Sequence, residues 1–131
     1  MNNIAKISTE EVMKKVEDGV SKKNVWQKPL LLLTKNGDDY NYVHDELNDR
    51  FRSVGLNHVI INNDDVDFYE YLGDDLLGYS EQFHRICVDY FEKTHKPVIS
   101  FICVEEANCS VENIPAWIYE QFEVVMLKGW Q

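Results

Sequence analysis

The sequence predicts an α/β fold of three layers, in which helices cover both faces of a mainly parallel sheet of about four strands. Short apolar runs alternate with amphipathic segments whose apolar residues recur every three or four positions. The runs are almost uniformly apolar, which is typical of parallel strands buried on both faces. The 131 residues, 44% of them apolar, suffice for one core. We therefore expect a single domain, with an N-terminal helix and connector over residues 1–28 and an α/β core over residues 29–131.

The first helix is predicted over about residues 9–19. Ser8 and Glu11 have the spacing of a capping box, in which each side chain accepts a hydrogen bond from the backbone of the other. Valines recur at every fourth position over Val12–Val20, which gives the helix one apolar face. Residues 22–28 then form a polar connector.

The other elements follow in order along the chain. The predicted strands are Leu30–Thr34, His58–Asn62, Val98–Val104 and Phe122–Leu127. The predicted helices are Tyr40–Val54, closed by Gly55, a long helix from Ser80 to about His95, and a short helix from Pro115 to Gln121. The segment Val66–Leu77 suits either a short helix or a poor strand.

The net charge of -10 is concentrated in one stretch of the chain. Seven lysines and four acidic residues make residues 1–37 positive by 3, whereas eleven acidic residues and two arginines make residues 38–75 negative by 9. Residues 76–131 carry -4. So much negative charge argues against non-specific binding to nucleic-acid phosphates and favours a partner with a basic surface. A solvated acidic face that aids solubility is the alternative.

Several further classes are excluded. The longest apolar runs, Leu30–Leu33 and Val124–Leu127, are far too short to span a membrane, and from the first eleven residues we expect no signal peptide. The cysteines, Cys87, Cys103 and Cys109, form no disulfide framework, so we expect reduced thiols in a cytoplasmic protein. No catalytic motif stands out, and His44, His84 and a cluster of aspartates lack the ligand spacing of a metal site. We predict no catalytic residue, metal or cofactor.

The connection after the first core strand is the usual ligand site of such a sheet. A phosphate-binding loop of the form G-x-x-x-x-G-K-[ST] offers glycines, a lysine and a hydroxyl to the phosphates. Residues 34–41 are instead T-K-N-G-D-D-Y-N, so that Gly37 alone is suited to such a loop. Asp38 and Asp39 would repel a triphosphate. We expect a turn over Lys35–Asp39 that does not bind ATP.

Two family resemblances pass through this loop. The chain resembles the nucleotide-binding core of AAA+ ATPases: Phe101–Asn108 is similar to their sensor strand, and Ile114–Val125 to the short helix and final strand that follow. Gln121 stands where that family often has an arginine, and Asp74 and Asp75 match its Walker B acids poorly. This resemblance implies a nucleotide-binding scaffold whose catalytic motifs are lost. A strand within Val66–Leu72 would strengthen it.

Residues 34–41 also resemble the glutaredoxin turn T-K-x-x-C-P-Y-C, over about 35 residues with the helix and strand that follow. Asp38 and Asn41 replace its two cysteines, so the resemblance implies a thiol-redox fold without disulfide chemistry. Both resemblances imply a scaffold that lacks the catalytic residues of the family.

The leading hypothesis is therefore a non-enzymatic protein-binding module. It would be an inhibitor, decoy or regulatory protein that acts on a basic partner such as an ATPase or a nucleic-acid enzyme, as virus-encoded antagonists do. Tyrosines interspersed among the acids supply contact area, and Trp130 is a candidate interface anchor. The predicted contact residues are Asp38, Asp39, Tyr40, Tyr42, Asp45, Asp64, Asp65, Asp67, Tyr69, Tyr71, Asp74, Asp75 and Trp130. The alternatives are a small ATPase-like or thioredoxin-like enzyme with an atypical loop, and a homo-oligomer that pairs near Trp130.

Overall fold

The chain forms an α/β structure, as the sequence predicts. A computed structural model describes residues 4–22, 26–35, 37–51, 60–62, 67–69, 79–103 and 114–128. The strands in these ranges are β1 (Ala5–Ile7), β2 (Leu30–Thr34), β3 (Ile60–Asn62), β4 (Asp67–Tyr69), β5 (Val98–Cys103) and β6 (Glu123–Leu127). The helices are α1 (Thr9–Lys22), α2 (Gly37–Phe51), α3 (Tyr79–Thr94) and α5 (Ala116–Gln121).

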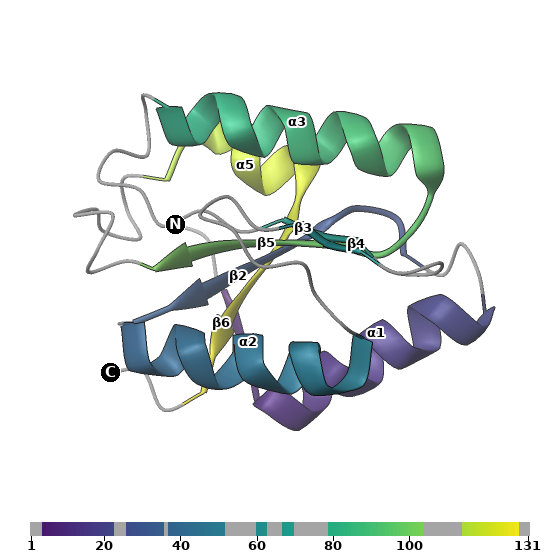
Figure 1. Ribbon diagram of the computed structural model, residues 1–131. Helices are drawn as coiled ribbons and strands as arrows, with labels where there is room; N and C mark the ends of the chain where they lie inside the picture. The colour runs from purple at the N-terminus through teal and green to yellow at the C-terminus, as the bar shows by residue number, and fades with distance from the viewer. Residues whose placement is uncertain are drawn as a thin grey trace.

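The six strands form one sheet in the order β1-β6-β2-β5-β4-β3. All neighbouring pairs are parallel except β3 and β4, which are antiparallel. Helices α1 and α2 lie on one side of the sheet, and α3 and α5 lie on the other (Figure 1). The expected arrangement of a mainly parallel sheet between two helical layers is therefore present.

Strand β2 is the middle of the sheet, because β5 and β6 pair with its two edges. Its leucines alternate between the two cores, as the two-residue period of a strand requires. Leu30 and Leu32 belong to the core under α1 and α2, and Leu31 and Leu33 belong to the core under α3 and α5. All four side chains are fully buried. The continuous apolar run thus has the role that the sequence predicts for it.

One strand, β1, is absent from the sequence prediction, and another, β4, lies where the sequence pattern leaves helix and strand open. β1 is three residues long at the edge of the sheet, and Ala5 and Lys6 are exposed, so it lacks an apolar pattern. β4 lies within the ambiguous segment Val66–Leu77, and its pairing with β5 and β3 resolves that segment as a strand at Asp67–Tyr69. Pairing with neighbours, rather than local sequence, makes both segments strands.

The capping box at the start of α1 is confirmed. The Ser8 backbone N–H donates to Glu11 Oε1 over 2.8 Å, and the Glu11 N–H donates to Ser8 Oγ over 3.1 Å. Hydrogen bonding of the Glu11 carboxylate to the Ser8 backbone and side chain, together with the nearby Lys128 ammonium, holds the pKa of Glu11 below its ordinary value. Val12 and Val16 are fully buried, which confirms the predicted apolar face.

Among the described residues, no helix combines the length and apolar character needed to cross a membrane.

Helix α1 continues past Gly19 to Lys22, beyond the predicted end. Gly19 is a packing residue: a Cβ built on it would lie 2.8 Å from Trp26 Nε1 and 2.9 Å from Pro97 Cγ. The indole N–H of Trp26 donates to the Lys15 carbonyl oxygen over 3.1 Å. The absence of a side chain at Gly19 therefore allows Trp26 to lie directly against the helix.

We predict that Gly19→Ala destabilises the protein. Alanine normally stabilises a helix relative to glycine by about 1 kcal/mol. Here the added methyl group would displace Trp26 and Pro97, at a cost of about 1–3 kcal/mol, which exceeds that gain. Urea unfolding of Gly19→Ala, with Lys14→Ala at an exposed site of the same helix as control, measures the effect. Stabilisation by Gly19→Ala would show that the close packing is absent.

Candidate functional site

The connection after β2 differs from the predicted turn. Only Lys35 and Asn36 separate the end of β2 from Gly37, the first residue of α2, so Asp38 and Asp39 lie in the first turn of the helix. The physical reason is the helix dipole, because carboxylates are favourable beside the unpaired N–H groups of an N-terminus. The aspartates that the sequence analysis places in a turn are therefore helical residues.

The inward face of α2 fixes its orientation on the sheet. Val43 and Leu47, one turn apart, are fully buried in the core that contains Leu30, Leu32 and Phe101. Burial of each such side chain stabilises the folded protein by about 2 kcal/mol. The helix is thus held by its apolar side, and the opposite side faces solvent.

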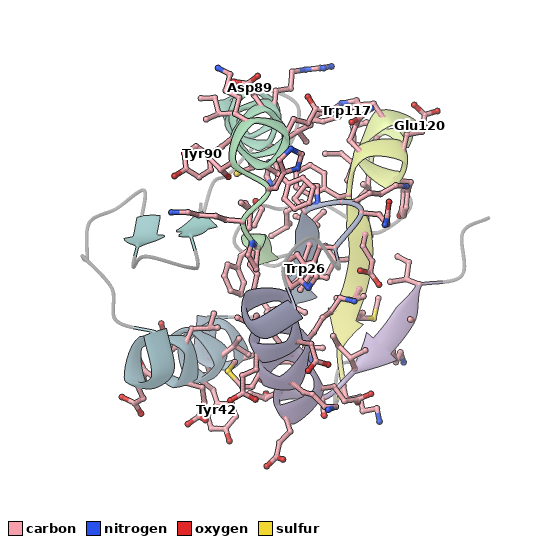
Figure 2. All side chains as sticks on the ribbon, turned by 90° about the vertical axis from the view of Figure 1, so that its right-hand side faces the viewer. Trp26, Tyr42, Asp89, Tyr90, Trp117 and Glu120 are labelled. Carbon is pink, nitrogen blue, oxygen red and sulfur yellow. The ribbon has the colours of Figure 1, made fainter. Side chains whose placement is uncertain are left out.

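The outward face of α2 carries an acidic stripe, formed by Asp38, Tyr42, Asp45 and Asp49. These residues are spaced by four, three and four positions, so their side chains lie along one line of the helix. All four are exposed. Figure 2 shows Tyr42 on the outer side of α2, away from the sheet. Asp39 and Glu46, which are half-buried, flank the stripe.

Tyr42 is 60% exposed, and within the described ranges it and Ile86 are the exposed large apolar side chains. A phenol ring among carboxylates offers rigid contact area with a hydrogen-bonding end. Charge and contact area on one helical line are what a protein-binding face with a basic partner requires.

The structure tests the predicted contact residues unevenly. It brings Asp38, Asp39, Tyr42 and Asp45 onto the first three turns of α2. Tyr40 lies in α2, and Asp67 and Tyr69 lie in β4, where the structure describes the backbone alone. The remaining predicted residues, Asp64, Asp65, Tyr71, Asp74, Asp75 and Trp130, lie outside the described residues. Asp49 is a stripe residue that the sequence analysis missed, although its spacing of four from Asp45 could have identified it.

The carboxyl end of β2 lies at the point where α/β sheets usually bind ligands. Thr34 pairs in register with Cys103 of β5, and α2, which follows β2, lies on the opposite face of the sheet from α5, the next described helix after β5 (Figure 1). The Thr34 hydroxyl is fully buried and has no hydrogen-bond partner among the described residues. A buried hydroxyl therefore stands at the end of β2, and carboxylates lie in the first turn of the helix that follows it.

A second polar group lies in the core under α3. His84, Cys87 and Ser100 are fully buried, and the His84 ring lies edge-on to Phe122 with centroids 5.8 Å apart. Burial raises the pKa of the Cys87 thiol to about 12, and the Ser100 hydroxyl acts weakly in the opposite direction. Cys87 is therefore a protonated core residue, as predicted. Within the ranges that the structure describes, no three histidine, cysteine or acidic side chains gather in a metal-binding cluster.

The structure also contains a pocket that the sequence analysis missed. It has a volume of about 530 Å³ and lies at the amino-terminal end of the sheet, between the connector before β2 and the ends of α3 and α5. Trp26 forms part of its wall, whereas the sequence analysis placed this residue in a polar connector. The only local signal was one tryptophan in a mostly polar segment.

Comparisons with family models, with curated proteins and with solved structures find no match for this chain. The described residues form an α/β protein whose helix α2 presents an exposed acidic face with one tyrosine.

We predict that Cys87 makes the protein less stable in alkali. An unfolded thiol ionises above its ordinary pKa of 9.0, whereas the folded thiol keeps its proton until about pH 12. The unfolded state thus binds fewer protons between these values, and stability falls as pH rises. From about pH 8 to about pH 10, the free energy of unfolding should fall by roughly 1 kcal/mol more in the native sequence than in Cys87→Ala.

Urea unfolding of both proteins at the two pH values measures this difference. The comparison cancels the titration of tyrosines and lysines, which both proteins share. An equal pH dependence in the two proteins would mean that the thiol is not buried from water.

Proposed function

We propose that the protein is a non-enzymatic binding module whose acidic stripe on α2 contacts a basic surface of another macromolecule. The observation that carries the proposal is the alignment of Asp38, Tyr42, Asp45 and Asp49 on one exposed helical line, opposite the buried Val43 and Leu47. A solvated face would not need an exposed tyrosine among its carboxylates. Charge steers the partner to the surface, and the ring supplies contact area once it arrives.

The acidic stripe also indicates the chemistry of the partner's surface. Three carboxylates along about three turns of helix suit a partner that presents lysines or arginines on a groove or ridge. Proteins that handle nucleic acids, and the ATPases that act with them, carry such surfaces. An inhibitor or decoy that offers negative charge in place of phosphate would bind there. We propose that this takes place in the cytoplasm, where the Cys87 thiol would stay reduced.

The scaffold is proposed to be a degenerate nucleotide-binding core. The sheet order supports this, because β5, which resembles the AAA+ sensor strand, lies beside β2, and β4 lies beside β5. β4 also occupies the position in the chain at which a Walker B strand is expected, between β3 and α3. The carboxyl ends of β2, β5 and β4 therefore lie at the same end of the sheet.

The alternative is a small nucleotide-dependent enzyme, and the same strand order favours it. Two features of the β2–α2 connection count against it. The connection has only two residues, and the first turn of α2, where a triphosphate would lie, carries Asp38 and Asp39. The helix N-terminus is thus already matched by negative charge.

The test of the binding proposal is a pair of matched charge reversals. Asp38→Lys with Asp45→Lys changes two exposed carboxylates seven positions apart on α2, and Glu10→Lys with Glu17→Lys makes the same change on α1. Partners captured by the native protein are identified, and their affinity is measured by calorimetry at low and moderate salt. The α2 variant should bind about tenfold more weakly or worse and lose most of the salt dependence. The α1 variant should resemble the native protein.

Tyr42→Ala, with Ile86→Ala as the control at a similarly exposed apolar site, separates contact area from charge. We expect a loss of about tenfold for Tyr42→Ala alone. Equal affinity in all four variants would refute the proposal.

Magnesium-ATP titration distinguishes the module from the enzyme. We expect no saturable heat, because Asp38 and Asp39 would face the phosphates. Saturable binding at about micromolar concentrations would instead identify a working nucleotide site.

A further inference from the structure

The pocket beside Trp26 lies at the start of β2, at the opposite end of this strand from the start of α2. Pro29, which precedes β2, and the C-terminal residues of α3 and α5 border it. Its volume of about 530 Å³ is within the usual range for pockets that bind ligands or side chains. The inference drawn from it does not rest on the acidic stripe of α2.

Trp26 forms a rigid aromatic wall of this pocket. Its indole N–H is held by the Lys15 carbonyl oxygen, and the edge of the ring lies against Gly19. The Lys15 ammonium lies 5.8 Å from the ring centroid and borders a neighbouring cavity rather than this one. A wall fixed by packing and a hydrogen bond binds without a large loss of side-chain freedom.

The other walls combine apolar surface with negative charge. Phe91 and Val88 provide an apolar floor, and Glu92 and Glu120, both exposed, bring carboxylates from α3 and α5. The C-terminus of α3 adds the negative end of its dipole. Lys28 is the one lysine or arginine in the lining, which also contains His95, against these two carboxylates. The charge of the pocket therefore suits a cation that carries several N–H donors.

Beside this pocket, α3 ends at a residue with an uncommon backbone conformation. His95 lines the pocket and has a left-handed backbone conformation, with φ of 60°. Its N–H donates to the Phe91 carbonyl oxygen over 2.8 Å, which closes the helix. The chain thus turns away toward β5 immediately after α3, and the pocket remains open beside the turn.

We propose that this pocket binds an arginine side chain from an extended segment of a partner protein. A guanidinium group in the pocket can stack on the Trp26 ring, while the carboxylates that Glu92 and Glu120 bring to the other walls attract its positive charge. The protein itself contains such a stack in the adjoining groove between α3 and α5, where Arg85 Cζ lies 4.1 Å from the Trp117 ring centroid. Arginine fits better than lysine, because its planar group stacks on an aromatic face and still has N–H donors for a carboxylate on the pocket wall.

The test uses two isosteric probes, N-acetyl-arginine-N-methylamide and N-acetyl-citrulline-N-methylamide. The second has the same shape without the charge. Each is titrated into the full chain labelled with ¹⁵N, and the Trp26 indole N–H and the backbone N–H groups of Glu92 and Glu120 are followed. We expect the arginine probe to shift these signals with a dissociation constant of about millimolar order, and the citrulline probe to bind about fivefold more weakly or worse.

Charge variants give opposite expected effects, which a general loss of folding could not produce. Glu92→Gln and Glu120→Gln should each weaken binding of the arginine probe about threefold. Lys28→Gln should strengthen it about twofold, because it removes the competing positive charge. Glu10→Gln, at an exposed site on α1 outside this pocket, is the control and should change nothing.

Three results would each overturn the inference. The first is equal binding of the citrulline probe, which would make charge irrelevant. The second is a shift pattern centred on α2 rather than on Trp26, which would assign arginine binding to the acidic stripe. The third is the absence of any shift at Trp26 up to about 20 mM probe.

Discussion

Four consecutive leucines must be kept from water on both sides of β2, and this constraint organises the molecule. Each buried leucine side chain stabilises the fold by about 2 kcal/mol, and alternation sends two of them to each face. Neither face can be left open, so α1 and α2 cover one and α3 and α5 cover the other. The backbone of β2 is satisfied by β5 and β6 at its two edges. The two helical layers and the central place of β2 follow from this arrangement.

The same constraint positions the two proposed binding surfaces. Because α2 must turn Val43 and Leu47 toward the sheet, its opposite line, with Asp38, Tyr42, Asp45 and Asp49, is left to solvent. Because β2, β5 and β6 run in parallel, α3 and α5 both end at the amino-terminal edge of the sheet, where their last turns and Trp26 enclose a pocket. The two surfaces lie on different parts of the molecule, so they can be tested independently.

Sequence patterns predict the parts of this structure that depend on local chemistry. The capping box at Ser8 and Glu11, the buried run of β2 and the buried thiol of Cys87 each follow from residue type and spacing. The parts that depend on distant segments could not be predicted. β1 and β4 are strands because β6 and β5 lie beside them, and Trp26 belongs to a pocket because Gly19 and α3 approach it through the fold. The start of α2 at Gly37 is an intermediate case, since the acidic pair beside it already favoured a helix N-terminus.

The organising role of β2 is tested most directly by native-state hydrogen exchange of the backbone N–H groups of residues 30–34. If β2 is the central strand, these groups exchange only when the whole molecule unfolds, and their exchange free energy equals the free energy of unfolding measured with urea. The solvent-facing N–H groups at the start of α2 should exchange through smaller openings. Exchange of β2 at a free energy well below that of global unfolding would contradict the account.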